Sequence, residues 1–139
     1  MQRVVLADAA GEIDKPERRG TVDALAVDQY DHEAAAPVLD SAEFYASCRA
    51  LLTEEGCMTV NLFGRSASYE RSLASMAQAF GEEALWAFKP TREGNTVVLA
   101  QRQATRPKPA ELRARAEAVQ ARWELPATKW LRVFKPVAR

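Results

Sequence analysis

The pattern that most constrains this chain is a short apolar run, then an amphipathic segment, then a second apolar run. Residues 22–27 (VDALAV) are interrupted only by Asp23, and residues 57–63 (CMTVNLF) form the second run. Near-continuous apolar runs of this length are typical of strands buried on both faces of a parallel sheet. A strand, a helix and a strand in this order predict parallel pairing with a right-handed crossover.

The segment between the two runs carries the signals of a helix. Asp40 and Glu43 have the spacing of an N-cap and an N3 residue, so each side chain can satisfy an unpaired backbone N–H. Gly56 predicts the end of this helix. One apolar face is formed by Phe44, Cys48, Leu51 and Leu52.

A second helix and a hairpin follow. Residues 84–88 and 96–100 are short apolar runs joined by a turn-rich loop, which predicts an antiparallel hairpin. Gly81 predicts the end of the helix before them. The apolar stripe of that helix comprises Tyr69, Leu73, Met76 and Phe80.

The two ends of the chain add a strand and a helix. Residues 3–7 (RVVLA) predict a first strand, and the polar stretch after it, with Gly11, Pro16 and Gly20, predicts a loop. Pro109 fits the first turn of a C-terminal helix. The stripe of this helix comprises Leu112, Ala116, Val119 and Trp123, and apolar residues that we expect to pack on the rest of the chain are Trp130, Leu131, Val133 and Phe134.

These elements predict an α/β fold. We expect a mixed sheet that is mostly parallel, a C-terminal antiparallel hairpin and a C-terminal helix. Residues 1–102 form the sheet-bearing part, and residues 103–139 form a basic helix and tail that pack on it.

Composition excludes several classes of protein. No apolar run reaches the ~18 residues of a membrane span, and no signal peptide is present, so we expect no membrane partner. The two cysteines form no C-x-x-C motif, which indicates buried, inert thiols and a reducing cytoplasm. A single histidine, His32, gives no basis for a metal site, and glycine-rich phosphate loops are absent.

The net charge of zero divides into two opposite halves. Residues 103–139 contain nine basic and three acidic residues and so carry +6, which leaves −6 for residues 1–102. A basic tail can contact nucleic acid, or it can be a solvated helix face that docks on an acidic body. We favour the second interpretation, because no nucleic-acid motif accompanies the charge.

The acidic loop after residues 22–27 is the strongest candidate for chemistry. Asp28 and Asp31 lie three residues apart, where ligands bind beyond the carboxyl ends of parallel strands, and Asp8 follows the first apolar run in the same way. Two such carboxylates can hold a cationic amine and accept its proton, with hydrogen bonds from Tyr30 and His32. The alternative, which spacing alone favours, is that these acidic residues simply populate an exposed loop.

The order of these segments resembles the C-terminal half of the spermidine synthase family, the polyamine aminopropyltransferases. That family has a Rossmann-like methyltransferase fold, and the resemblance covers residues 2–102. It is carried by Asp8-Ala9, DALAVDQYD (23–31), PVLDSAEFY (37–45), GCMTVNLFGR (56–65), YERSLASMAQAFG (69–81) and GNTVVLAQR (94–102).

The resemblance implies a site and a reaction. Asp28 would be the base that deprotonates an attacking amine, Asp31 would bind that amine and Tyr30 would line the pocket. Asp8 and Ala9 would contact the adenine of a nucleoside cosubstrate, decarboxylated S-adenosylmethionine or S-adenosylmethionine, with no tightly bound cofactor and no metal. The amine nitrogen would attack the propyl carbon next to the sulfonium.

The chain also departs from the family. Its acidic loop reads Asp-Gln-Tyr-Asp-His where the family usually has Asp-Ser-Ser-Asp-Pro, and the family's glycine-rich half would precede residue 1. We therefore expect a late start or a truncated gene, no activity of the chain alone, and either a complementing chain or a homo-oligomer. Two alternatives stay open: a non-catalytic remnant that serves protein association, and a methyltransferase-like enzyme on the same scaffold.

Overall fold

The computed structural model describes residues 1–28, 40–63 and 67–138, and its centre is a five-stranded mixed sheet. The strands lie in the order β1-β2-β4-β3-β5. Their bounds are β1 Val22–Asp28, β2 Leu52–Phe63, β3 Leu85–Phe88, β4 Asn95–Gln101 and β5 Phe134–Pro136. The helices are α1 Ala9–Ile13, α2 Ala42–Leu51, α3 Ala67–Phe80, α4 Pro109–Trp123 and α5 Ala127–Trp130, with short 3-10 turns at Pro16–Arg18 and Glu82–Ala84.

The strand pairings confirm the predicted α/β fold class. β1 and β2 are parallel with α2 between them in the chain, and β3 and β4 form the expected antiparallel hairpin. The sheet was expected to be mostly parallel, but one strand pairing is parallel and three are antiparallel. The reason is that β4, not β3, lies beside β2, while the C-terminal tail adds β5 antiparallel to β3.

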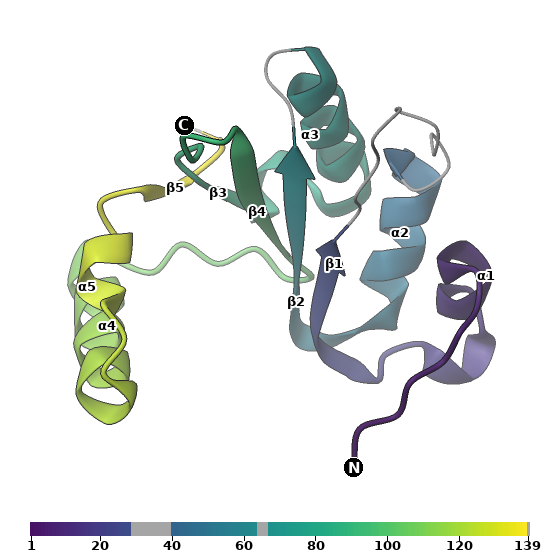
Figure 1. The fold of residues 1–139 in the computed structure, drawn as a ribbon, viewed down its shortest axis with the longest axis horizontal. Helices are drawn as coiled ribbons and strands as arrows, with labels where there is room; N and C mark the ends of the chain where they lie inside the picture. The colour runs from purple at the N-terminus through teal and green to yellow at the C-terminus, as the bar shows by residue number, and fades with distance from the viewer. Residues whose placement is uncertain (29–39, 64–66, 139) are drawn as a thin grey trace.

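Helices α2 and α3 cover one face of the sheet (Figure 1). Side chains alternate along the strands, so every second residue of β2 and β4 points into this layer, and the core cluster is continuous. Both helical stripes take part, as predicted. Buried members of the core include Phe44, Tyr45 and Cys48 of α2, Met76 and Phe80 of α3, and Met58, Val60 and Val98 of the sheet.

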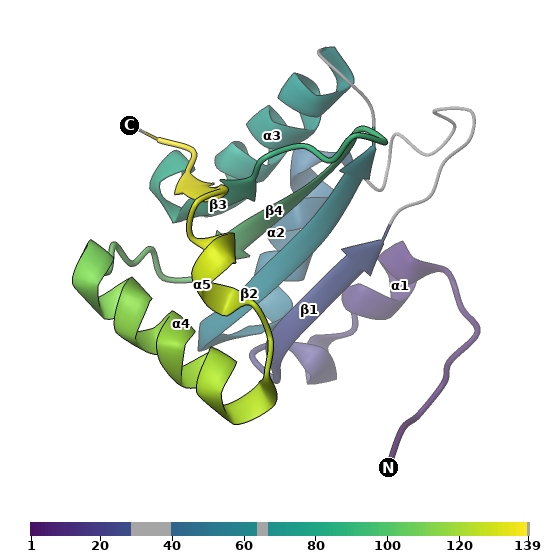
Figure 2. The same cartoon turned by 60° about the vertical axis from the view of Figure 1, so that its left-hand side comes forward.

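The opposite face of the sheet is open at its β1 side. Ala24 pairs with Cys57 and Ala26 pairs with Thr59 on this face, and both alanines are exposed. α4 and α5 lie beyond β5, at the other end of the sheet from β1 (Figures 1 and 2). A parallel strand pair is usually covered on both faces, and here one cover is missing within the described residues.

The start and end of α2 differ from the prediction. Ser41, not Asp40, is the N-cap, and its hydroxyl accepts a hydrogen bond from the backbone N–H of Phe44 at 3.1 Å. The helix ends at Leu51, because Leu52 takes an extended backbone and pairs with Val22 of β1. Gly56 therefore lies inside β2 and does not end the helix.

The predicted strand at residues 3–7 is wrong. These residues form no strand, and Val4 and Leu6 are 86% and 104% exposed. The predicted loop after them is instead α1 and a 3-10 turn. A strand needs a neighbour for its backbone hydrogen bonds, and among the described strands none lies beside this segment to supply one.

The C-terminal tail packs on the sheet through one of its large residues. Phe134 lies against the rings of Trp86 and Phe88, with ring centroids 5.2 Å and 4.7 Å apart. Trp130 stays exposed, and so does Trp123 at the end of the α4 stripe. Of the large tail residues that were expected to pack on the rest of the chain, Phe134 does so, whereas Trp130 and Val133 are exposed.

Candidate active site at the carboxyl ends of β1 and β2

Three polar side chains line up across the open face of the sheet, where the parallel strands β1 and β2 end. The amide nitrogen of Asn95 donates to the amide oxygen of Asn61 at 3.3 Å, and the amide nitrogen of Asn61 donates to Asp28 Oδ1 at 3.2 Å. Asp28 is the last residue of β1, and Asn61 is its register partner on β2. The two asparagines therefore orient the Asp28 carboxylate.

Asp28 is suited chemically to accept a proton or to bind a cation. The carboxylate is exposed, and within the described part of the chain it receives one amide hydrogen bond and no ion pair. A carboxylate at this edge of an α/β sheet lies where ligands usually bind.

The sequence reasoning missed Asn61 and Asn95. The signal for Asn61 was present, because it is a polar amide in the middle of the apolar run at residues 57–63. Asn95 carried no such signal, since it directly follows Gly94 in what reads as a turn. Only the antiparallel register of β2 and β4 brings the two amides together.

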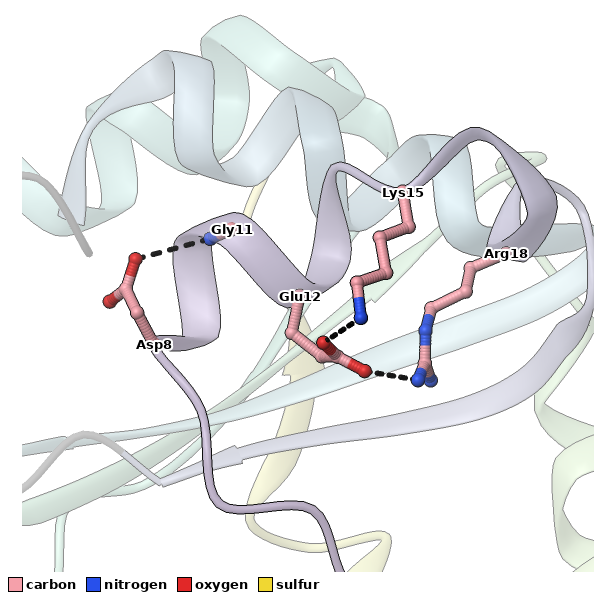
Figure 3. A network of polar contacts seen from close by, with 5 residues as sticks. All are labelled: Asp8, Gly11, Glu12, Lys15 and Arg18. Carbon is pink, nitrogen blue, oxygen red and sulfur yellow. Dashed lines mark hydrogen bonds and ion pairs between the residues drawn. The ribbon is translucent and has the colours of Figure 1, made fainter.

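Asp8 caps α1 (Figure 3). Its Oδ2 accepts a hydrogen bond from the backbone N–H of Gly11 at 3.2 Å, and Ala9 is the first residue of the helix. Asp8 and Asp28 thus lie on different elements, and no hydrogen bond joins them. The predicted contact of Asp8 and Ala9 with a nucleoside stays a prediction.

A small ion-pair network anchors α1 to the 3-10 turn that follows it. Glu12 is paired with both Lys15 and Arg18 (Figure 3). The hydrogen bond from Lys15 holds the pKa of Glu12 below its usual value, and the Arg18 charge adds to this effect. The network fixes the turn that leads into β1, away from the Asp28 carboxylate.

The other two candidate site residues, Tyr30 and Asp31, lie outside the described residues, as does His32.

The first described residue after them is Asp40. Its Oδ1 accepts a hydrogen bond from Tyr45 Oη at 2.7 Å, and its Oδ2 accepts one from Ser72 Oγ at 2.8 Å. Burial raises the pKa of Tyr45, so this phenol stays a proton donor to Asp40. Asp40 thereby ties the start of α2 to α3.

Two hollows lie away from the Asp28 carboxylate. One of about 490 Å³ is lined by Tyr69 of α3, Phe88 of β3 and Lys135 of β5, among others. A smaller one of about 130 Å³ lies between α1 and α2 and is lined by Ile13 and Phe44, among others. Neither hollow is lined by Asp8 or Asp28. Within the described residues, the candidate site is therefore an exposed strand end that neither of these hollows includes.

Residues 1–28, 40–63 and 67–138 contain no group of three or more histidine, cysteine or acidic side chains placed to hold a metal ion. In the same ranges no helix is both long enough and apolar enough to span a membrane.

The two thiols differ in accessibility. Cys48 is fully buried on α2, and burial raises the pKa of its thiol to about 12, whereas Cys57 is half-buried on the open face of the sheet. Since the thiolate is the reactive form, we expect iodoacetamide at pH 8 to alkylate Cys57 in the folded protein and to leave Cys48 unmodified. Peptide mass spectrometry measures this. Equal labelling of both thiols without denaturant would contradict the packing of α2.

No protein-family model matches the sequence, and no curated protein matches it. Solved structures do match the fold. A spermidine synthase from Thermotoga maritima matches at 15% identity and a TM-score of 0.59, over 80% of this chain and 40% of that chain. A spermidine synthase in complex with the transition state analogue AdoDATO matches at 16% identity and a TM-score of 0.63, over 80% and 41%.

A probable spermidine synthase from Corynebacterium glutamicum matches at 15% identity and a TM-score of 0.66, over 96% of this chain and 48% of that chain. The chain has a spermidine synthase-like fold. This finding agrees with the resemblance carried by the sequence segments. The chain spans less than half of the length of each of these structures, so its spermidine synthase-like fold is a partial one.

Proposed function

We propose that this chain provides the amine side of an aminopropyltransferase active site, with Asp28 as the general base. The observation that carries the proposal is the Asp28 carboxylate, which Asn61 orients at the carboxyl end of β1 in a spermidine synthase-like fold. The amine would lose a proton to Asp28 while its nitrogen attacks the propyl carbon next to the sulfonium of decarboxylated S-adenosylmethionine. Methylthioadenosine is the leaving group.

The remaining predicted residues take supporting roles in this proposal. Asp31 binds the amine, Tyr30 lines its pocket, and Asp8 with Ala9 contacts the nucleoside. Placing the amine nitrogen in line with the propyl carbon supplies a large part of the rate, and the proton transfer to Asp28 supplies ~10²–10⁴-fold more.

The proposed reaction requires more polypeptide than these 139 residues. Among the described residues the Asp28 side chain is exposed, and neither of the two hollows reaches it. The spermidine synthase structures with this fold are more than twice as long as the part that matches. The remaining polypeptide would supply the glycine-rich turn that binds the nucleoside at a helix N-terminus.

We expect the isolated chain to show no calorimetric binding of methylthioadenosine, S-adenosylmethionine or its decarboxylated form. The physical reason is that a small ligand needs an enclosing pocket, and Asp28 at the carboxyl end of β1 is exposed. Micromolar affinity of the isolated chain would contradict the requirement for further polypeptide.

The decisive test combines the chain with the polypeptide encoded directly upstream of Met1. We expect the longer product to release methylthioadenosine from decarboxylated S-adenosylmethionine in the presence of a diamine. The absence of release from a folded longer product, or a stop codon directly upstream, would count against catalysis. It would favour a non-catalytic association subunit, for which the place of β1 at the edge of the sheet formed by the described strands is the supporting observation.

A further inference from the structure

The larger of the two hollows is walled by three parts of the chain. It has a volume of about 490 Å³ and lies between α3, β3 and the C-terminal segment that contains β5. Both views place the β3–β5 end of the sheet beside α3 (Figures 1 and 2). Pockets of about 300–1,000 Å³ commonly hold one small organic ligand. The hollow therefore has room for a small molecule.

The wall of the hollow is partly aromatic and aliphatic. Phe88 of β3 lies in it, with its ring centroid 4.7 Å from that of Phe134, its register partner on β5. Leu73 of α3 and Val137 also line it, and both pack against the core. Side chains held in this way lose little freedom when a ligand binds, so a planar ring meets a wall that is already formed.

Positive charge lines the same hollow. Lys89, Arg132 and Lys135 are lining residues, and within the described part of the chain none of them forms an ion pair. Lys135 Nζ donates instead to the backbone oxygen of Leu131 at 3.1 Å, a contact that leaves its charge in place. Glu70 is the acidic residue of the wall, so three basic residues against one acidic residue leave a net charge of +2. The hollow therefore favours an anion.

Tyr69 of α3 adds a hydrogen-bond donor to the wall. Burial raises the pKa of its phenol, and the charge of Glu70 adds to this effect. The phenol therefore stays protonated at neutral pH and can donate to an anionic oxygen. An aromatic wall, three cations and a phenol together match a carboxylate that is attached to a planar ring.

We propose that the hollow between α3, β3 and β5 binds a small aromatic carboxylate, with its ring against Phe88 and its carboxylate toward Arg132 and Lys135. This site is separate from the candidate active site, because Asp28 does not line the hollow and lies at the other end of the sheet, on β1. The proposal does not rest on aminopropyl transfer.

Calorimetric titration of the full chain with 2-naphthoate tests the site, and 2-naphthamide serves as the neutral ligand of the same shape. We expect naphthoate to bind about 10-fold more tightly than the amide, because two exposed charges contribute up to about fivefold each. The affinity for naphthoate should also fall as salt is added. Equal affinity for the two ligands, or no binding of naphthoate at millimolar concentration, would overturn the proposal.

Charge variants locate the site. Arg132→Gln with Lys135→Gln should weaken naphthoate binding about 10-fold, whereas Glu70→Gln should strengthen it about twofold to fivefold. The matched control is Arg113→Gln with Arg115→Gln, which removes two charges from exposed positions of α4 outside the hollow and should leave the affinity unchanged. Equal weakening in both double variants would show attraction to the whole basic segment and no specific site. The substituted side chains are exposed, so unchanged melting temperatures are expected and verify the fold.

The longer product that includes the polypeptide upstream of Met1 should bind naphthoate with the same affinity, because the residues that line the hollow all belong to this chain. Loss of binding in the longer product would overturn the proposal for the larger protein. Asp28→Asn should bind naphthoate like the wild-type chain, so the outcome for this site and the outcome for aminopropyl transfer are read separately.

Discussion

Asp28→Asn should reduce aminopropyl transfer by the longer, nucleoside-binding product about 10²–10⁴-fold while the fold stays intact. Asparagine has nearly the same shape as aspartate and keeps the oxygen that accepts the Asn61 hydrogen bond. It cannot accept a proton from the amine at neutral pH. Turnover under saturating diamine is the measurement, with the thermal melting curve recorded in parallel.

Asp23→Asn is the matched control for this variant. Asp23 is on the same strand but near its amino end, where it accepts a hydrogen bond from Thr53 Oγ1 at 2.8 Å. It lies far along β1 from the strand end that carries Asp28, so we expect nearly unchanged turnover. Full activity of Asp28→Asn would refute the assignment of the base, and equal losses in both variants would indicate a general charge effect.

Gly56→Ala should destabilise the fold more than any surface substitution. A Cβ atom at this position would lie 2.8 Å from the backbone oxygen of Val22, and 3.0 Å from both Leu52 Cβ and the backbone oxygen of Thr53. Here the β1–β2 register shifts, because Val22 pairs with Leu52 whereas Ala24 pairs with Cys57. Overpacking of this kind costs about 1–3 kcal/mol, which would lower Tm by about 4–15 °C.

Gly11→Ala provides the control for the glycine substitution. Gly11 lies within α1, and the nearest atom to an added Cβ is Asp8 Oδ2 at an ordinary 3.7 Å. Alanine is favoured over glycine inside a helix by about 0.5–1 kcal/mol, so Tm should stay the same or rise. A Gly56→Ala protein that melts with the wild-type chain would show that the β1–β2 junction relaxes around the methyl group.

The predictions that held depend on local periodicity. The stripe from Phe44 to Leu51 identified α2, and the stripe that ends at Phe80 identified α3, because burial of one helix face repeats every three to four residues. The apolar runs of β1 and β2 identified the parallel pair. The local pattern did not place the start of α2, because Ser41 and Asp40 are both suitable N-cap residues and Ser41 takes the cap.

The predictions that failed depend on partners distant in sequence. Residues 3–7 have the composition of a strand, but composition cannot show whether a neighbouring strand exists. In the candidate site, too, one residue was predictable from a local pattern and its contact was not. Asp28 was identified from its place after an apolar run, whereas its contact with Asn61 requires the β1–β2 register.

By itself, the sequence determined the α/β class, the parallel β1–β2 pair with α2 between its strands, and Asp28 at the strand end. These follow from short-range patterns of burial and from the residue types at strand ends. Tertiary structure alone decided that β4 lies beside β2, that Asn95 reaches Asn61, and that β1 is the first strand in the sheet order. The physical reason is that strand order and register are set by hydrogen bonds between segments far apart in the chain, which no local pattern encodes.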